Sequence, residues 1–141
     1  MNFLPARFAG GAHRQTILSA LAPSPAVEGT TVTRHVPVGP GQALRLRITR
    51  PEGRERGTLL LVHGLAGSAE APYVRWTASE ALGRNWCIAR VDLRGCGGTE
   101  ELSRSCHNAS HSDDISRLLK ALERENWPRP YGAVGFSLGA G

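Results

Sequence analysis

Alternating apolar and polar residues predict a β-hairpin in the amino-terminal part of the chain. Residues 30–38 are rich in β-branched side chains and roughly alternate, and residues 44–49 alternate leucine or isoleucine with arginine or threonine. The glycine-proline-glycine turn 39–41 separates the two runs. A period of two places the apolar side chains of a strand on one face. We therefore expect an antiparallel pair with one face in a core and one in water. Residues 1–28 read as irregular, with a short helical turn over 15–21.

The pattern changes after Gly57. Residues 58–62 and 131–136 are apolar runs without alternation, which is typical of strands buried between helices, and residues 86–91 read as a further buried strand. Two stretches with helical spacing of apolar residues, 71–83 and 112–126, separate them. The first carries Val74, Ala78, Ala81 and Leu82 on one side, and the second Ile115, Leu118, Leu119 and Leu122. The order predicts an α/β fold in one domain over residues 29–141, with right-handed crossovers.

Length and charge narrow the class of protein. The chain has 141 residues and a formal net charge of +5, with 17 basic against 12 acidic side chains. A loose group of arginines, at positions 45, 47, 50, 54 and 56, has no aromatic residues among it, so we expect a solvated basic surface and no nucleic-acid partner. The longest apolar run, 59–62, is too short for an integral membrane segment.

The cysteines and the amino-terminal residues indicate in which cellular compartment we expect the protein. Cys87, Cys96 and Cys106 are odd in number and have neither Cys-x-x-Cys nor zinc spacing. The apolar stretch 17–22 is too short for a signal peptide. We expect a reduced cytoplasmic protein with no metal site and no cofactor.

The most informative motif follows the last apolar run. Residues Gly135–Gly139 fit Gly-x-Ser-x-Gly, with Ser137 between a strand and a run of small residues. In a sharp strand-to-helix turn the serine hydroxyl projects into a cleft, and side chains in place of Gly135 and Gly139 would collide. The N–H of Leu138 would then point to where an oxyanion develops. We predict that Ser137 is a nucleophile; the alternative is a glycine-rich turn without chemistry.

A second motif lies directly after the first buried run. His63–Ser68 reads His-Gly-Leu-Ala-Gly-Ser. The loop at this place supplies the other backbone donor of an oxyanion hole, which we assign to the N–H of Leu65, and Gly64 lets the chain pass close to the substrate. His63 is expected to hold the loop by a hydrogen bond rather than to act as a base.

Together with the loop Arg94–Gly98, these two motifs resemble the α/β-hydrolase superfamily, and within it the YheT-type branch, which is related to the abhydrolase-domain lipid esterases. Further residues match that branch: the His-x-Gln-Thr of residues 13–16, the Tyr-x-Arg of residues 73–75, and His107. Cys106, Asn108 and Ala109 depart from its Tyr-His-Ala-Gly segment, and Ala140-Gly141 replaces its usual Gly-Asn continuation.

The resemblance implies a serine hydrolase that cleaves carboxylic esters, such as acyl glycerols or short acyl esters, through an acyl-enzyme at Ser137. In this fold the triad acid and histidine come after the nucleophile, yet all five histidines (13, 35, 63, 107 and 111) precede Ser137. We therefore expect the amino-terminal half of a hydrolase, near-inert by itself, with the strand 131–136 exposed at a sheet edge. His107 and His111 are expected to be exposed or loop-fixing rather than catalytic.

Two alternatives stay open. A non-catalytic module could keep the fold for binding and leave Ser137 unreactive. A nucleotide-binding domain is disfavoured, because Gly95-Cys96-Gly97-Gly98 lacks the third glycine of the fingerprint, at Glu100, and no Gly-Lys-Ser/Thr occurs. Substrate identity and oligomeric state are not encoded in any pattern here.

Overall fold

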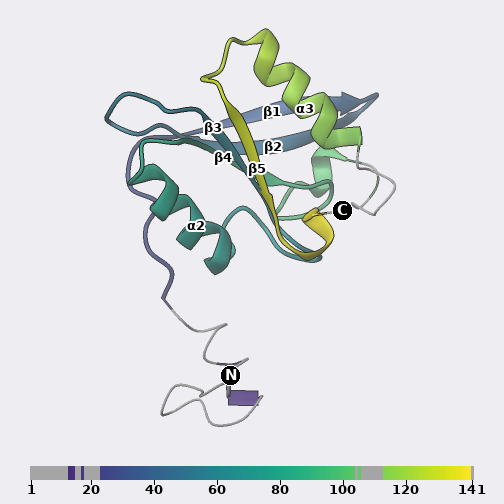
Figure 1. Cartoon of the computed structure of the whole chain (residues 1–141). Helices are drawn as coiled ribbons and strands as arrows, with labels where there is room; N and C mark the ends of the chain where they lie inside the picture. Colours follow the sequence, from purple (N-terminus) through teal and green to yellow (C-terminus); the bar gives the residue numbers. More distant parts are fainter. Residues whose placement is uncertain (1–12, 15–16, 18–22, 104, 106–112, 141) are drawn as a thin grey trace.

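Five strands form one mixed sheet (Figure 1). The computed structural model describes residues 13–14, 17, 23–103, 105 and 113–140. The elements are β1 (Thr31–Gly39), β2 (Gln42–Thr49), β3 (Thr58–Val62), α2 (Pro72–Leu82), β4 (Cys87–Asp92), η1 (Glu100–Leu102), α3 (Asp113–Arg124), β5 (Tyr131–Gly135) and η3 (Ser137–Ala140). Among the described residues, the strands and helices predicted after residue 29 are present, with ends displaced by one or two residues, and η1 was not expected.

The strand order is β1-β2-β4-β3-β5. β1 and β2 form the predicted antiparallel hairpin, and β2 continues antiparallel to β4. β3 runs parallel to β4 on one side and to β5 on the other. The predicted α/β sheet is confirmed. As expected, β5 lies at an edge, and none of its residues is fully buried.

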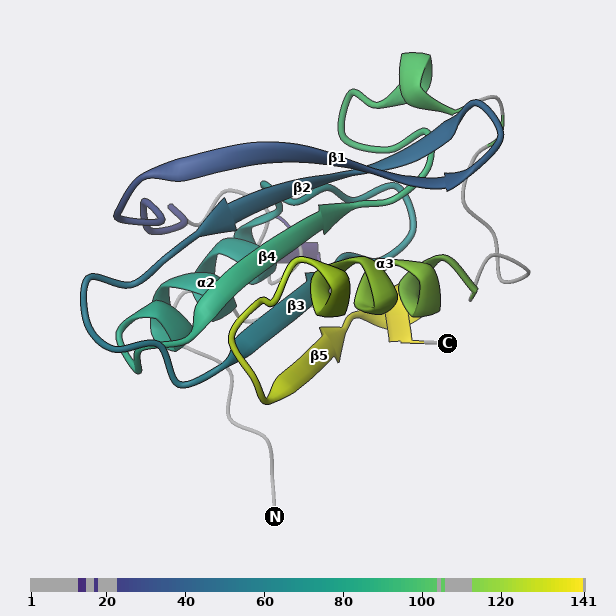
Figure 2. The ribbon, with the colours of Figure 1, turned by 90° about the horizontal axis from the view of Figure 1, so that it is seen from above.

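Helices α2 and α3 lie on opposite faces of the sheet (Figure 2), and a separate apolar layer lies between each helix and the strands. Leu60 faces the layer that contains Leu118 and Leu122 of α3, and its neighbour Leu61 faces the layer that contains Val74 and Ala78 of α2. Successive residues of a strand point to opposite faces, so β3 and β4 carry apolar side chains on both faces, with Arg90 and Asp92 of β4 as charged exceptions. Helical spacing predicts these faces correctly.

The second face of the hairpin is less exposed to solvent than the alternation of apolar and polar residues predicts. On β2, Thr49 is fully buried, and the side chains of Arg45 and Arg47 are only 16% and 29% exposed. Both arginines pair with the carboxylate of Asp92, at the end of β4. The expectation of a solvated basic surface is wrong for these two residues, because β4 brings a buried negative charge beside them.

Some sequence predictions fall outside the described residues. These are most of the helical turn over 15–21, of which only Ile17 is described and is helical, and the segment that holds Cys106, His107 and His111. The amino-terminal boundary drawn at residue 28 stays a prediction.

Candidate active site

Ser137 lies at the junction of β5 and η3, in a strained turn. Its φ angle is 52°, in the left-handed region that non-glycine residues rarely adopt. A Cβ on Gly135 would lie 2.6 Å from the Cα of Ala140, and a Cβ on Gly139 would lie 2.8 Å from the carbonyl oxygen of Val62. Neither contact is tolerable, so both motif glycines are required by this turn. The Ser137 side chain is exposed at its tip.

The loop after β3 reaches the same place. A Cβ on Gly64 would lie 3.0 Å from the carbonyl oxygen of Phe136 and 3.2 Å from the Cβ of Ser137. Gly67 N–H donates to the Gly64 carbonyl at 3.1 Å and closes a turn, whose third residue, Ala66, has φ 54°. This turn carries Leu65, whose side chain is 76% exposed. The sequence-predicted donors, Leu65 and Leu138, therefore sit on two chain segments that touch beside Ser137.

Tyr73 connects this loop to α2 and to the turn Gly135–Gly139 around Ser137, which we call the elbow. Its hydroxyl accepts a hydrogen bond from Gly64 N–H at 3.2 Å, and its ring contacts Phe136, with 4.7 Å between ring centroids. Gly67 leaves room for the Tyr73 hydroxyl, which would lie 2.8 Å from a Cβ at that position. The sequence singled out Tyr73 by resemblance alone and assigned it no contact.

His63 is fully buried, and both of its ring nitrogens are engaged. Nδ1 lies 2.7 Å from the Gly64 carbonyl oxygen, so it carries the proton and donates. Nε2 therefore accepts, from Leu93 N–H at 3.1 Å. The ring joins the ends of β3 and β4, and neither nitrogen is available to take a proton from Ser137.

Asp92 and Asp114 organise the remaining loops, and sequence reasoning missed both contacts. The fully buried Asp92 accepts from Ala69 N–H at 2.7 Å and from Arg45 Nε at 2.9 Å, and a side chain at Gly97 would strike its carboxylate. Asp114, in the first turn of α3, accepts two hydrogen bonds from Arg94 at 2.5 Å each.

An open pocket of about 400 Å³ is lined by Gly64, Leu65, Tyr73, Phe136 and Ser137. The pocket lies at the carboxyl ends of the parallel strands, where open α/β sheets bind ligands. The arrangement places the exposed Ser137 beside the backbone of the Gly64 loop and the aromatic side chains of Tyr73 and Phe136. Such a site suits attack on an uncharged carbonyl compound.

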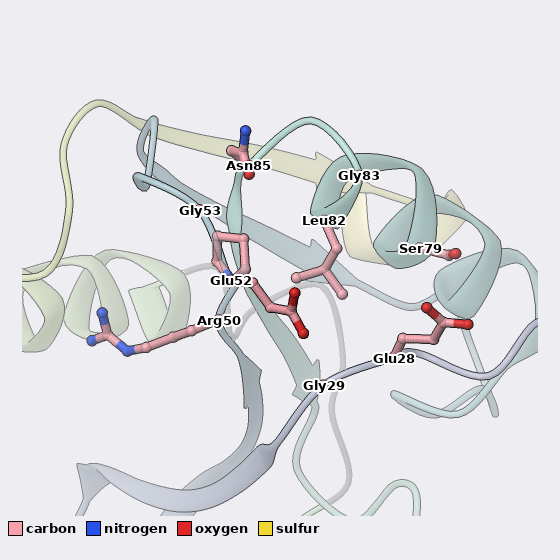
Figure 3. A pocket seen from close by; sticks show the side chains of 10 residues that line it. Glu28, Gly29, Arg50, Glu52, Gly53, Ser79, Leu82, Gly83 and Asn85 are labelled. Atoms are coloured by element: carbon pink, nitrogen blue, oxygen red, sulfur yellow. The ribbon is translucent and has the colours of Figure 1, made fainter.

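A second pocket, of about 430 Å³, lies at the opposite ends of these strands (Figure 3). It is bordered by the segments that precede β1, β3 and β4 and by the end of α2, and its charged residues are Glu28, Arg50 and Glu52. Among the described residues that line it there is no histidine or cysteine. We assign no catalytic role to it.

The described part of the chain offers neither a reactive buried thiol nor a metal-binding cluster. Burial raises the pKa of the Cys87 thiol from 9.0 to about 11, with nearby Arg50 opposing the shift, so this thiol stays protonated and unreactive at neutral pH. The described residues contain no group of histidine, cysteine and acidic side chains that could hold a metal ion. They also contain no helix long and apolar enough to cross a membrane.

The alpha/beta hydrolase fold family matches residues 57–141, which include both β3 with its loop and the elbow at Ser137. The chain belongs to this family. Its match covers the three parallel strands, so the elbow and the loop after β3 stand in the order that the family has.

Named relatives agree with this assignment. The Escherichia coli (strain K12) protein YheT, whose name classes it as an esterase, is 29% identical over 140 residues, which are 98% of this chain and 41% of YheT. The yeast medium-chain fatty acid ethyl ester synthase/esterase 2 is 31% identical over 84 residues, 58% of this chain and 18% of that protein. The chain therefore spans less than half the length of these relatives.

Solved structures show the same fold. An alpha-beta serine hydrolase homologue from Coxiella burnetii superposes with a TM-score of 0.64 at 25% identity, over 79% of this chain and 53% of that one. An a/b serine hydrolase without lid from Xanthomonas campestris gives a TM-score of 0.64 at 22% identity, over 84% and 55%. The resemblance to the YheT-type branch is supported along nearly the whole chain.

Proposed function

We propose that this chain is the nucleophile-bearing part of a serine esterase that cleaves carboxylic esters, acyl glycerols or short acyl esters, through an acyl-enzyme at Ser137. The observation that carries the proposal is the contact between the Gly64 loop and the turn around the exposed Ser137, because the two proposed donors, Leu65 and Leu138, belong to these two segments. Names of two relatives contain the word esterase, which supports an ester as the substrate.

In the proposed reaction Ser137 Oγ attacks the ester carbonyl, and the N–H groups of Leu65 and Leu138 stabilise the oxyanion. The bond from carbonyl carbon to the alcohol oxygen then breaks, and the alcohol leaves with the proton that a base took from Ser137. Water hydrolyses the acyl-enzyme in the same way. Gly64 and Gly139 keep the two donor-bearing segments in contact.

The base is the unassigned part of this site. His63 uses both ring nitrogens inside the fold, and no histidine or acidic residue follows Ser137 in the sequence. We propose that the 141 residues alone turn over esters slowly or not at all, and that a longer protein containing them supplies the acid and the histidine. A reduced, cytoplasmic location is part of the proposal and rests on the odd number of cysteines.

The test compares the 141-residue chain with a longer protein that contains it. Hydrolysis of p-nitrophenyl butyrate and labelling by a fluorophosphonate probe are measured for both, with Ser137→Ala as the diagnostic variant. Ser116→Ala is the matched control, since Ser116 is an exposed serine on α3, away from the pocket.

We expect turnover and labelling only in the longer protein, lost in Ser137→Ala and kept in Ser116→Ala. A longer protein that contains an acid and a histidine after Ser137 but is never labelled would favour a binding module instead. Brisk turnover by the 141-residue chain that depends on Ser137 would refute the proposed incompleteness.

A further inference from the structure

Three guanidinium groups converge on the carboxylate of Glu70, just before α2. Arg90 Nη1 lies 3.0 Å from Glu70 Oε1, Arg47 Nε lies 3.4 Å from the same oxygen, and Arg75 Nε lies 3.8 Å from Oε2. The arginines come from β4, β2 and α2, so only the folded chain brings them together. We call Arg47, Arg75 and Arg90 the arginine cluster.

Positive charge exceeds negative charge around this cluster. The second carboxylate in contact with it is that of Asp92, whose Oδ2 lies 3.5 Å from Arg47 Nε. Asp92 already pairs with a fourth arginine, Arg45, at 2.9 Å. Four guanidinium groups thus share two carboxylates, so this set of ion pairs has a formal net charge of +2.

Several donors of the cluster are also unsatisfied. The Nε atoms of Arg47, Arg75 and Arg90 are buried and have no hydrogen-bond partner among the described residues. The side chain of Arg90 is only 4% exposed. Burial lowers the pKa of Arg90, and the charges of Arg47 and Arg75 lower it further, while Glu70 opposes the shift. Buried donors without acceptors cost free energy that an added acceptor recovers.

Access to the cluster exists from solvent. The side chains of Arg47 and Arg75 are 29% and 28% exposed, and that of Glu70 is 44% exposed. Glu70 is therefore the most exposed of these side chains, and a change of its rotamer would uncover donors of the arginines. Its contacts with two of them, at 3.4 and 3.8 Å, exceed hydrogen-bond length and are weakly held.

We propose that the arginine cluster binds a phosphate group, free or on a small monoester, in competition with the carboxylate of Glu70. A phosphate dianion matches the excess of two charges, and its oxygens accept from several guanidinium N–H groups at once. The site is separate from the Ser137 pocket, whose lining it does not share, and the proposal does not rest on esterase activity.

The experiment titrates the protein with inorganic phosphate slightly above neutral pH, where the dianion predominates. The arginine Nε–H signals are followed in ¹H–¹⁵N correlation spectra, because the unpartnered Nε–H groups respond directly to an acceptor. Sodium chloride at equal ionic strength controls for non-specific screening of the charges. Acetate tests whether an anion with a single charge binds as well, and glycerol 3-phosphate distinguishes a phosphate monoester from free phosphate.

Two variants change affinity in opposite directions. Glu70→Gln removes the competing carboxylate and should tighten phosphate binding by about two- to fivefold, the size of one partly exposed charge interaction. Arg75→Gln should weaken it by about tenfold, the size of one charge-assisted contact. Arg84→Gln is the matched control, since this arginine is 73% exposed near the end of α2 and should leave the affinity unchanged.

Saturable shifts with phosphate and not with chloride, stronger in Glu70→Gln, would support the site. Equal shifts with chloride, or unchanged or weaker binding in Glu70→Gln, would refute it and leave Glu70 as a purely structural counter-ion. Circular dichroism establishes that each variant is folded, and Arg47→Gln replaces Arg75→Gln if the latter unfolds.

Discussion

The buried ion pair between Arg94 and Asp114 predicts a large loss of stability when only one partner is neutralised. Asp114 Oδ2 and Oδ1 accept from Arg94 Nε and Nη2 at 2.5 Å each, and the two side chains are 7% and 1% exposed. The pair ties the glycine-rich loop after β4 to the first turn of α3. Asp114→Asn keeps the shape of the side chain but leaves the arginine charge buried and unpaired.

Burial sets the expected size of this effect. Removing one partner of a buried ion pair costs about 3–5 kcal/mol, against about 0–1 kcal/mol for an exposed pair. The neighbouring Asp113 provides a matched control, because it lies in the same first turn of α3 but is exposed. Asp113→Asn should lose only the helix-dipole contribution, about 0.3–1 kcal/mol.

Urea denaturation followed by circular dichroism measures both variants, with equal m-values as the condition for comparing free energies of unfolding. The double variant Arg94→Met with Asp114→Leu should lose less stability than Asp114→Asn alone, since no charge is left unpaired. If Asp114→Asn costs no more than Asp113→Asn, the pair contributes as an exposed one would, and our reasoning from burial is wrong.

Three further perturbations test other contacts. Gly139→Ala should destabilise the chain by about 1–3 kcal/mol, because its Cβ would strike the Val62 carbonyl. The control Gly83→Ala should be neutral or slightly stabilising, since Gly83 has φ −59° and the nearest atom to its Cβ would be 3.6 Å away. Thermal denaturation compares the two variants, and equal losses of stability would contradict the elbow geometry. Tyr73→Phe keeps the ring contact with Phe136 but removes the acceptor for Gly64 N–H. Urea denaturation should therefore show a free energy of unfolding lower by about 0.5–1.5 kcal/mol. An unchanged free energy would mean that the hydroxyl does not hold the loop. The Cys87 thiol should resist iodoacetamide in the folded chain and react in urea, and rapid alkylation of the folded chain at pH 8 would contradict its burial. Because burial raises the pKa of this thiol from 9.0 to about 11 in the folded chain, its contribution to stability is complete below pH 9 and is lost between about pH 9 and 11.

Local patterns in the sequence were enough for the elements and for the two parts of the site. β3 is apolar on both faces, and the helical spacing of Leu118 and Leu122 selects the face of α3 that packs on the sheet. Ser137 and Gly64 could be found because each depends on a few consecutive residues whose backbone conformation is set by glycines. Their meeting, however, required β3 and β5 to be neighbours.

The sequence by itself determined which segments form strands and helices, which faces are apolar, and where the chain turns sharply around a serine. Only the tertiary structure decided the order β1-β2-β4-β3-β5 and the partners of the charged residues. Asp92 pairs with Arg45 across 47 positions, and Arg94 with Asp114 across 20. The physical reason is that hydrophobic periodicity is a property of neighbouring residues, whereas a buried charge is satisfied by whichever opposite charge the strand pairing brings to it.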